Sequence, residues 1–448
     1  MSTPPGYGGL GIVRLSGRKS LSISKRIFRP RRKCWRDISA RTSILGDIFD
    51  SEKKEFIDEA FLAYFPAPRS YTRENVVEIS CHGSPVILEE VVRLGIRAGA
   101  RPAHPGEFTL RAYLGGRMDI IQAEAVNDLI TAASLHQAKI SLGQLRGGLS
   151  RRIELLRSQV VDLISLLEAS IEFPEEGLGI PPGEAASRLE KILQAINALI
   201  ASYETGRAMT EGLNLAIVGR ANVGKSTLFN ALLDHERAIV SPYPGTTRDY
   251  LRERIKIKGS FFHLIDMAGL ERPSHPVEKD GIRRSRELAS RADGILFVLD
   301  ASRNESQADL GLIEKFKKKR MILVFNKADL PGRIDRSKCR AVIPTSRSIG
   351  VSALKGTNIA RLKNAIWETF SAGESIHEDV ILHMRQKTLF EQVSFALEDG
   401  LKRLREGHPE EICAEEVRRA LPFIGQLTGE IRVDEVMTNI FSRFCVGK

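Results

Sequence analysis

A glycine-rich stretch near the middle of the chain has the residue types and spacing of a phosphate-binding loop. It reads Gly219-Arg-Ala-Asn-Val-Gly224-Lys225-Ser226 and directly follows the apolar run LNLAIV, which predicts a strand, a loop and a helix in that order. The glycines let backbone N–H groups surround phosphates at the helix N-terminus. Lys225 would neutralise the β and γ oxygens, and Ser226 would bind Mg²⁺. The stretch therefore predicts a nucleoside triphosphate site.

Further polar motifs follow apolar runs downstream, and they are Gly245-Thr246-Thr247, Asp266-Met-Ala-Gly269, Asn326-Lys327-Ala-Asp329 and Ser352-Ala353-Leu354. Thr247 would supply a second Mg²⁺ hydroxyl, Asp266 would hold the metal through water, and the Gly269 N–H would sense the γ-phosphate. Asp329 would accept from guanine N1–H and the 2-amino group, a pair that adenine lacks. Each motif alone is compatible with turn chemistry at a strand end. Their order along the chain predicts GTP.

One expected residue is missing from this set. Ras-type enzymes place a water-orienting Gln after the glycine of the DxxG motif, whereas this chain has Leu270. Asn222 offers a carbonyl oxygen to a monovalent cation near the phosphates. Glu278 in PVEKDGI is a candidate for ordering the attacking water. A solvated helix cap is the alternative interpretation of Glu278, and chemistry alone leaves both open.

The elements that must position these motifs change in character along the chain. Up to about Asp119 the sequence is mixed α and β, with strands predicted in GLGIVRLSG, AFLAYFPAP and NVVEISCHG. PVILEEVVRLGIRAG predicts a helix closed by Gly99. From about Gly212 to Phe370, β-rich runs alternate with helical stretches, as in a parallel α/β sheet. From His377 the chain is helical again, which predicts an α/β domain inserted into a helical one.

Two apolar stripes precede the α/β region, and both are interpreted as the core of a helical bundle. The first predicts one long helix through Leu142, Leu145, Leu149, Ile153, Leu156, Val160, Leu163 and Leu167. The second predicts another helix through Leu189, Ile192, Ile196 and Leu199.

Composition narrows the class of protein. The 448 residues are 42% hydrophobic and 27% charged, which is typical of a soluble globular protein, and no apolar run is long enough to span a bilayer. The net charge of +11 suits a polyanionic partner. The densest basic run, KRIFRPRRKCWR, is interpreted as a solvated loop in preference to a phosphate contact.

The five cysteines include no CxxC, so we predict neither disulfides nor a zinc site. The first residues lack the order of a signal peptide, so we predict a cytoplasmic protein.

With Asn222, the SPYPGTTRD loop and the terminal FCVGK, the ordered motifs resemble the MnmE (TrmE) family of tRNA-modification GTPases. The resemblance covers essentially the whole chain, and it rests also on TPPGYGGLGIVRLSG, SYTRENVVEISCHGSPV, HPGEFTLRAYLGGRMDIIQAEAVNDLI, EFPEEG and GEIRVDEVMTNIFSRFCVGK. It implies an N-terminal α+β domain that dimerises and binds folate, a helical domain, and an inserted Ras-like P-loop GTPase domain. The predicted boundaries are 1–118, 119–210 with 372–448, and 211–371.

The resemblance also implies an activity and its partners. Members pair with an FAD-containing protein, MnmG (GidA), which implies a homodimer that forms a heterotetramer with it. Together they place an aminomethyl or carboxymethylaminomethyl group on C5 of the wobble uridine of certain tRNAs. The one-carbon carrier is 5-formyl- or 5,10-methylene-tetrahydrofolate, and the GTPase domains dimerise around K⁺.

Site residues are carried over by motif. The implied folate residues are Arg14, Glu78, Arg117 and Lys448. The implied K⁺ ligands are Asn222, Ser241, Tyr243 and Thr246, the middle two through backbone carbonyls. Ser226 and Thr247 would hold Mg²⁺, and Glu278 would orient water. The full predicted nucleotide set is Asn222, Val223, Gly224, Lys225, Ser226, Thr227, Ser241, Thr246, Thr247, Asp266, Gly269, Asn326, Lys327, Asp329, Ser352, Ala353 and Leu354.

Several positions depart from the family pattern. Members usually have a further strand before TPPG, so the early start is either a misassigned start or a true truncation, and it is expected to weaken the N-terminal sheet. Tyr7 replaces the usual Arg and Met267 the usual Thr, and Arg117 stands where Lys is common. A guanidinium fork is not equivalent to a point charge.

The apolar end FCVGK has two interpretations. GEIRVDEVMTNIFSRF predicts an amphipathic helix whose apolar face is formed by Val433, Val436, Met437, Ile440, Phe441 and Phe444. We expect this face to dock on the helical domain and to aim the last residues at the folate pocket across the dimer, where Lys448 would meet folate. Cys445 would then be a nucleophile toward the uracil ring. The alternative, a cysteine that only packs near the terminus, stays equally open.

Two other functions remain as alternatives. One is an RNA-binding switch GTPase of the ribosome-assembly kind, although the sequence has no GXXG loop of a KH module. The other is a GTPase that has lost folate function through its early start.

Overall fold

The computed structural model describes residues 1–31, 35, 40–132, 134–173, 180–233, 252–266, 292–344, 346–370, 380–431, 434–442, 444 and 447. They belong to two compact units, which are 1–131 with 141–200 and 385–448, and 132–140 with 201–384. Because the second unit interrupts the first in sequence, the predicted insertion of an α/β domain is confirmed.

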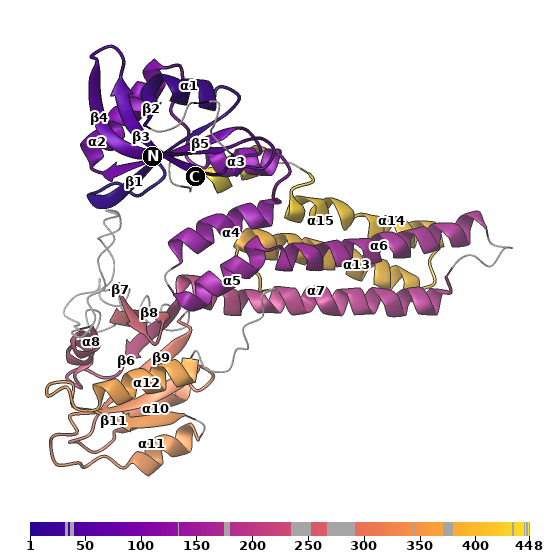
Figure 1. Cartoon of the computed structure of the whole chain (residues 1–448). Coiled ribbons are helices and arrows are strands. Elements are labelled where there is room, and N and C mark those ends of the chain that lie inside the picture. The colour runs from indigo at the N-terminus through magenta and orange to yellow at the C-terminus, as the bar shows by residue number, and fades with distance from the viewer. Residues whose placement is uncertain are drawn as a thin grey trace, which may run out of the picture. The chain divides into compact units, whose positions relative to one another are not determined.

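The first unit begins with an antiparallel sheet of order β1-β5-β4-β3-β2 (Figure 1). Its strands are β1 (Gly8–Ser16), β2 (Phe28–Pro30), β3 (Ser43–Asp50), β4 (Glu55–Phe65) and β5 (Val76–Gly83). The three strands predicted from sequence correspond to β1, β4 and β5. Alternation places Val13, Val77 and Ile79 on the buried face of the sheet.

Two helices cover that face. The helix α1 (Ser20–Ile27) contributes Ile27, and α2 (Pro85–Arg97) contributes Leu88, Val91 and Leu94 to the same core. The predicted closing of α2 is confirmed, because Gly99 has a φ of +106° and its N–H donates to the Ile96 carbonyl. A third helix, α3 (Glu107–Leu114), follows this layer.

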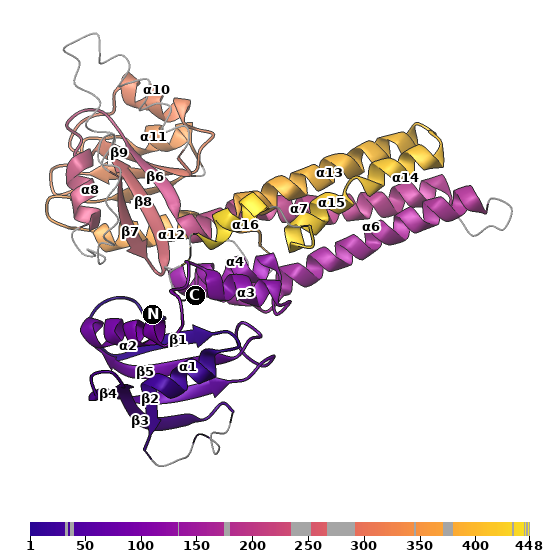
Figure 2. The same ribbon diagram turned by 90° about the horizontal axis from the view of Figure 1, so that it is seen from above.

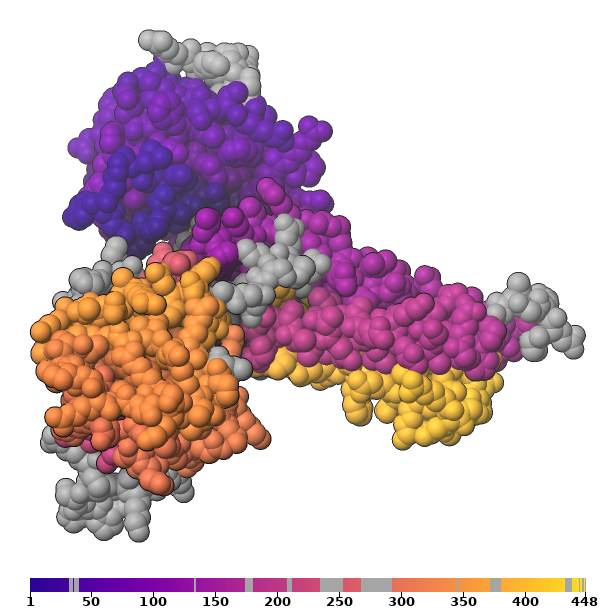
Figure 3. Space-filling view, turned by 90° about the horizontal axis from the view of Figure 1, so that it is seen from below, coloured from indigo at the N-terminus to yellow at the C-terminus, as the bar shows by residue number. Residues whose placement is uncertain are grey.

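The helical part of the first unit is a bundle of segments far apart in sequence (Figure 2). Its helices are α4 (Ile120–Thr131), α6 (Gly148–Glu172), α7 (Pro182–Glu211), α13 (Met384–Arg405), α14 (Glu410–Arg418), α15 (Leu421–Thr428) and α16 (Asp434–Phe441). Residues 201–211 of α7 and the first half of α5 (Leu135–Leu145) belong to the second unit. Ser394 bonds to Asn197, and Arg405 pairs with Glu190. In Figure 3 the magenta residues of the long helices accordingly lie directly against the yellow C-terminal residues.

The prediction of one long helix through Leu142 and Leu167 is wrong. The chain leaves the helix after Leu145, and a new helix starts at Gly148. The break lies at Gly147, whose φ of +83° is left-handed and whose N–H donates to Gln144 O. The spacing of the apolar stripe passes through this break unchanged, so periodicity alone did not reveal it.

The second unit is built on a sheet of order β11-β10-β9-β6-β8-β7. Its strands are β6 (Leu213–Val218), β7 (Arg252–Ile257), β8 (Ser260–Asp266), β9 (Gly294–Asp300), β10 (Met321–Asn326) and β11 (Arg347–Gly350). All described pairs are parallel except β7 with β8. Lys258 and Gly259 both have positive φ in the turn between these two strands, as a two-residue hairpin of type I′ requires.

Helices cover both faces of this sheet. On one face α8 (Lys225–Leu233) and α12 (Ile359–Phe370) bury Leu228, Phe229 and Ile366. On the other face α10 (Gln307–Lys315) and α11 (Arg336–Val342) bury Ile313 and Cys339. The parallel core strands therefore end at one common edge, where ligands of such folds bind.

Candidate functional site

The phosphate loop joins β6 to α8 and has the backbone that the motif requires. Gly219 and Gly224 have φ of +156° and +93°. A Cβ at Gly219 would collide with Val298 O, and one at Gly224 would collide with the Asn326 side chain. Only glycine fits both positions, and the N-terminus of α8 follows with its N–H groups directed at the loop.

Lys225 lies inside this loop. Its ammonium donates to Gly219 O at 2.6 Å and Arg220 O at 2.8 Å, and the residue is 5% exposed. Asp266, at the end of β8, is 7% exposed, while Ser226 at the start of α8 is exposed. The loop thus holds a buried cation beside an accessible hydroxyl, which is the arrangement needed for a phosphate and its metal.

Asn326 connects the two loops of the predicted base site. Its Nδ2 donates to Val223 O at 2.9 Å, and its Oδ1 accepts from the Ala353 N–H at 3.0 Å. Ser352 and Ala353 are buried, whereas Leu354 is 82% exposed. The amide of Asn326 therefore fixes the phosphate loop and the Ser352-Ala353-Leu354 loop relative to each other.

Lys327 also links the phosphate loop to the rest of the sheet, through a contact with Asp300 that the sequence interpretation missed. Its ammonium donates to Asn222 O at 2.8 Å and pairs with Asp300 at 2.7 Å. Burial raises the pKa of Asp300, but the Lys327 and Ser302 hydrogen bonds outweigh it and lower that pKa overall. A signal for this contact was available in the sequence, because Asp300 ends the apolar run GILFVLD just as Asn326 ends MILVFN. The two residues are direct partners in neighbouring strands.

Asp329 is prepared to accept hydrogen bonds. The Ser352 hydroxyl holds the pKa of Asp329 below its usual value, with Lys355 Nζ 3.8 Å from the carboxylate. Ser352 is itself fixed by paired backbone bonds with Thr357. An ionised, oriented carboxylate at this place is what recognition of guanine N1–H and its 2-amino group needs.

In the first unit, β1 and β5 bring two predicted folate residues together. Arg14 and Glu78 are direct cross-strand partners, and Arg14 Nε lies 2.8 Å from Glu78 Oε1. Arg14 Cζ is also 5.7 Å from the ring centroids of both Tyr71 and Phe108. The side chains of the pair are 19% and 26% exposed, so both remain accessible to a ligand.

Arg117 reaches the same place from another part of the chain. Its Nη1 donates to Ser70 O at 2.6 Å, and its Cζ lies 5.0 Å from the Tyr71 ring centroid. The guanidinium groups of Arg14 and Arg117 therefore both lie close to the Tyr71 ring. The sequence interpretation quoted SYTRENVVEISCHG but gave Tyr71 no role, because nothing local to it indicates two cation contacts.

A cavity of about 460 Å³ adjoins this cluster, and Arg14 lines it. Its walls are mostly apolar side chains of α1 and α2, including Ile23, Ile27 and Val91. Arg101, Glu107 and Arg111 line it as well. An apolar space with cations at its wall suits a flat heterocycle with an anionic tail.

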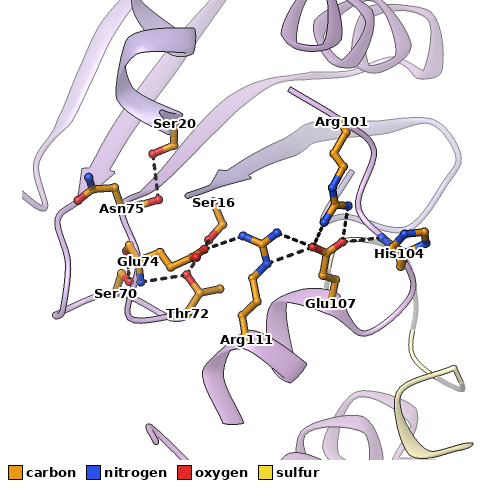
Figure 4. A network of polar contacts seen from close by, with 10 residues as sticks. All are labelled: Ser16, Ser20, Ser70, Thr72, Glu74, Asn75, Arg101, His104, Glu107 and Arg111. Atoms are coloured by element: carbon orange, nitrogen blue, oxygen red, sulfur yellow. Dashed lines mark hydrogen bonds and ion pairs between the residues drawn. The ribbon is translucent and has the colours of Figure 1, made fainter. Parts of the chain in front are cut away.

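Figure 4 shows the polar network at that wall. Glu107 accepts from Arg101 Nη1 at 2.8 Å, from the His104 N–H at 2.9 Å and from Arg111 Nε at 3.1 Å. Arg111 Nη1 bonds to Glu74 at 2.7 Å, and the Ser16 hydroxyl donates to Glu74 at 2.8 Å. The Arg101 bond is the leading cause that lowers the pKa of Glu107 from 4.5 to about 2. Sequence reasoning missed this network, although Glu107 and Arg111 have helical i, i+4 spacing.

The C-terminal helix is held against α3. The rings of Phe441 and Tyr113 are 6.4 Å apart, and Phe444 is 5% exposed beside Phe441. Gly106 leaves space for the backbone of Phe441, since a Cβ there would collide with it. We expected this face on the helical domain, but the described ring contacts are made with α3. Gly447 lies beside the N-terminal segment, because the Ser2 hydroxyl donates to Gly447 O at 3.5 Å.

Comparison with known proteins decides the family. The sequence model described as "MnmE helical domain" matches residues 120–445, and that described as "GTP-binding protein TrmE N-terminus" matches 1–117. The tRNA modification GTPase MnmE of Aquifex aeolicus is 40% identical over 450 residues, covering 100% of this chain and 98% of that protein. That of Thermotoga petrophila is 39% identical over 451 residues, covering 100% and 99%. This chain belongs to the MnmE family.

MnmE membership confirms the predicted resemblance, the fold class and the GTPase enzyme class. Some positions predicted for MnmE function lie outside the described residues, and they are Ser241, Tyr243, Thr246, Thr247, Gly269, Glu278, Cys445 and Lys448. In the part of the chain that is described, no helix combines the length and apolar character needed to cross a membrane.

Proposed function

We propose that this chain is a tetrahydrofolate-dependent tRNA modification enzyme driven by GTP hydrolysis in the cytoplasm. With an FAD-containing MnmG (GidA) partner, it adds an aminomethyl or carboxymethylaminomethyl group to C5 of the wobble uridine of certain tRNAs. The active form is a homodimer that joins the partner in a heterotetramer. The observation that carries the proposal is the meeting of Arg14, Glu78 and Arg117 around Tyr71 beside an apolar cavity.

The residues present fit a folate. Glu78 offers acceptors to the donor edge of a pterin, and the Tyr71 and Phe108 rings offer stacking surfaces. Arg14 and Arg117 suit the glutamyl carboxylates. The bound folate supplies a one-carbon unit; the protein's own part is to orient it and to exclude water from it.

The GTPase residues have separate tasks. Lys225 binds the β and γ phosphates, and Ser226 with Thr247 holds Mg²⁺. Asn222, with Ser241, Tyr243 and Thr246, binds K⁺ in place of an arginine finger. Glu278 orients the attacking water, because Leu270 has no polar group to do so.

Cys445 is proposed as the nucleophile toward the uracil ring. Its thiolate would add to C6 of the ring and make C5 nucleophilic; after C5 has bonded to the one-carbon unit, loss of the C5 proton would break the C6–S bond and release the thiolate. Support comes from its neighbours, since Phe444 is buried and Gly447 lies beside Ser2. The Ser2 N–H in turn donates to Ile12 O of β1, the strand that carries Arg14, so Gly447 lies near that strand.

The test is nucleoside analysis of tRNA from a deletion strain that expresses variants of this chain. Deleting 445–448 should abolish wobble-uridine modification and leave GTP hydrolysis largely intact, because the second unit carries its own chemistry. The Cys445→Ser variant distinguishes a nucleophilic Cys445 from one that only packs. Full modification of tRNA by this variant would rule out the nucleophile role and leave the packing role standing. A deletion strain with fully modified tRNA and defective ribosome assembly would instead favour the assembly-GTPase alternative.

A further inference from the structure

The positive charge of the protein is concentrated at one place in its sequence. Residues 1–36 contain ten Lys and Arg and no Asp or Glu. Since the whole chain has a net charge of +11, the other 412 residues together contribute only +1. Attraction of the protein to a polyanion should therefore depend mainly on where these first residues lie.

Five cations of the described part of this segment lie on the outer face of α1 or directly next to its ends. Ser20, Ile23, Ser24 and Ile27 form the buried face of the helix. The opposite side is exposed, continues to the start of β2, and consists of what we call the basic stripe: Arg18, Lys19, Lys25, Arg26 and Arg29. The stripe thus arises because α1 uses its apolar residues in the core and has no acidic residue on its outer face.

No member of the basic stripe forms an ion pair with a described carboxylate. Lys25 Nζ lies 5.7 Å from the Trp35 ring centroid, and Arg29 Cζ lies 3.3 Å from that of Phe49. Contacts with a ring position a cation without cancelling its charge. Arg31, just beyond the stripe, differs because it pairs with Asp47 and Glu59.

We propose that the basic stripe binds the phosphate backbone of the tRNA, an inference that rests on the proposed function. Contacts of Lys and Arg with phosphates position an RNA without reading its bases. Arg18 and Lys19 also line the cavity beside Arg14, so the stripe leads from the outer face of α1 toward the predicted folate residues. An anionic membrane is the weaker alternative, since Ile23 and Ile27 are buried and leave α1 without an apolar face to insert.

The experiment measures binding of unmodified tRNA to the full chain across a series of KCl concentrations. The test variant is Lys25→Gln with Arg26→Gln. Its matched control is Arg152→Gln with Lys191→Gln, which removes one Arg and one Lys from exposed positions on α6 and α7 that have no described ion pair. Each lost phosphate contact should lower the slope of log K against log salt by about 0.7–0.9. We expect the test variant to lose about 1.5 in slope and roughly thirtyfold in affinity at 0.1 M salt, with the control close to wild type.

Other results overturn the inference. Equal weakening in both variants would mean that net charge matters and the stripe does not. Unchanged binding by the test variant would remove the stripe from the interface. Loss of binding to phosphatidylserine vesicles with tRNA binding intact would favour the membrane alternative. If the wild-type chain binds no tRNA even at low salt, the proposed function fails together with the stripe, whereas the first three outcomes leave that function standing.

Discussion

Glu107 is the carboxylate that binds both arginines of the cavity wall, Arg101 and Arg111. It is 8% exposed and accepts hydrogen bonds from two arginines and a backbone N–H. Arg101 and Arg111 are therefore held in fixed orientations beside the space where an anionic ligand tail would lie. A carboxylate with so many donors is stabilised in its charged form, which is why its pKa lies at about 2.

Glu107→Gln should make the first unit less stable in a pH-dependent way. A folded-state pKa of about 2, below the ordinary 4.5, adds stability above pH 4.5 that is lost as pH falls toward 2. We expect a deficit of at most about 3 kcal/mol at pH 7, shrinking through that window. Urea unfolding followed by Trp35 fluorescence in a Trp367→Phe background measures it. Glu89→Gln, at an exposed position, is the control, and a deficit of equal size at pH 7 and pH 3 would contradict the argument.

Asp329 should determine the choice of base. Asp329→Asn removes the acceptor pair for guanine N1–H and the 2-amino group, so GTP affinity should fall roughly tenfold or more. Xanthine carries an acceptor where guanine has its 2-amino group, so xanthine nucleotides should compete better against the variant. Competition binding of GTP and XTP measures this, and unchanged GTP affinity would refute the assignment.

At the scale of elements, the phosphate loop is fixed by contacts from two other strands. Asn222 has a φ of +64°, and its carbonyl accepts from Lys327, which follows β10. Lys327 is in turn held by Asp300 at the end of β9. The side chain of Asn222 is a separate group and is exposed, so its amide oxygen Oδ1 is accessible to a cation beside the phosphates.

We therefore expect GTP turnover to need K⁺ in addition to Mg²⁺. Rates are compared in KCl and NaCl of equal ionic strength, and hydrolysis should be fast only in KCl. Asn222→Ala should reduce the dependence on K⁺ while leaving nucleotide binding nearly unchanged. Equal wild-type rates in both salts would rule out the K⁺ assignment.

The elements also indicate what the sequence could and could not predict. The phosphate loop and α2 were predicted because their signals are local: glycine spacing, apolar periodicity and a closing glycine. The pairing of Arg14 with Glu78 depends on the register of β1 against β5, across 64 residues. The docking of Phe441 on α3 depends on packing between segments still further apart in sequence. Such contacts follow from tertiary packing, which no short pattern encodes.

For the whole molecule, two units mean two separate hydrophobic cores. Trp35 packs on the core under α1 and α2, while Trp367 packs on the core of the α/β unit. These are the two tryptophans of the chain, so each reports on one unit. The chain should therefore not be treated as a single two-state system.

Ligands should shift the two unfolding transitions independently. GDP with Mg²⁺ should raise the midpoint reported by Trp367 in a Trp35→Phe variant and leave that of Trp35 in a Trp367→Phe variant unchanged. 5-Formyl-tetrahydrofolate should do the reverse. At a hundredfold excess over Kd the gain is about 2.7 kcal/mol. Coincident shifts of both reporters with either ligand would show one cooperative body.

The contact between Ser2 and Gly447 also matters for protein engineering. Figures 1 and 2 both place the N and C labels side by side. A short peptide linker can therefore close the backbone into a ring, and new ends can be opened at the exposed turn of Lys53 and Lys54. A purification tag joined at Met1 or after Lys448 would start beside the close contact between Met1 and Gly447. The same tag inserted at the Lys53 turn would leave the terminal contact intact.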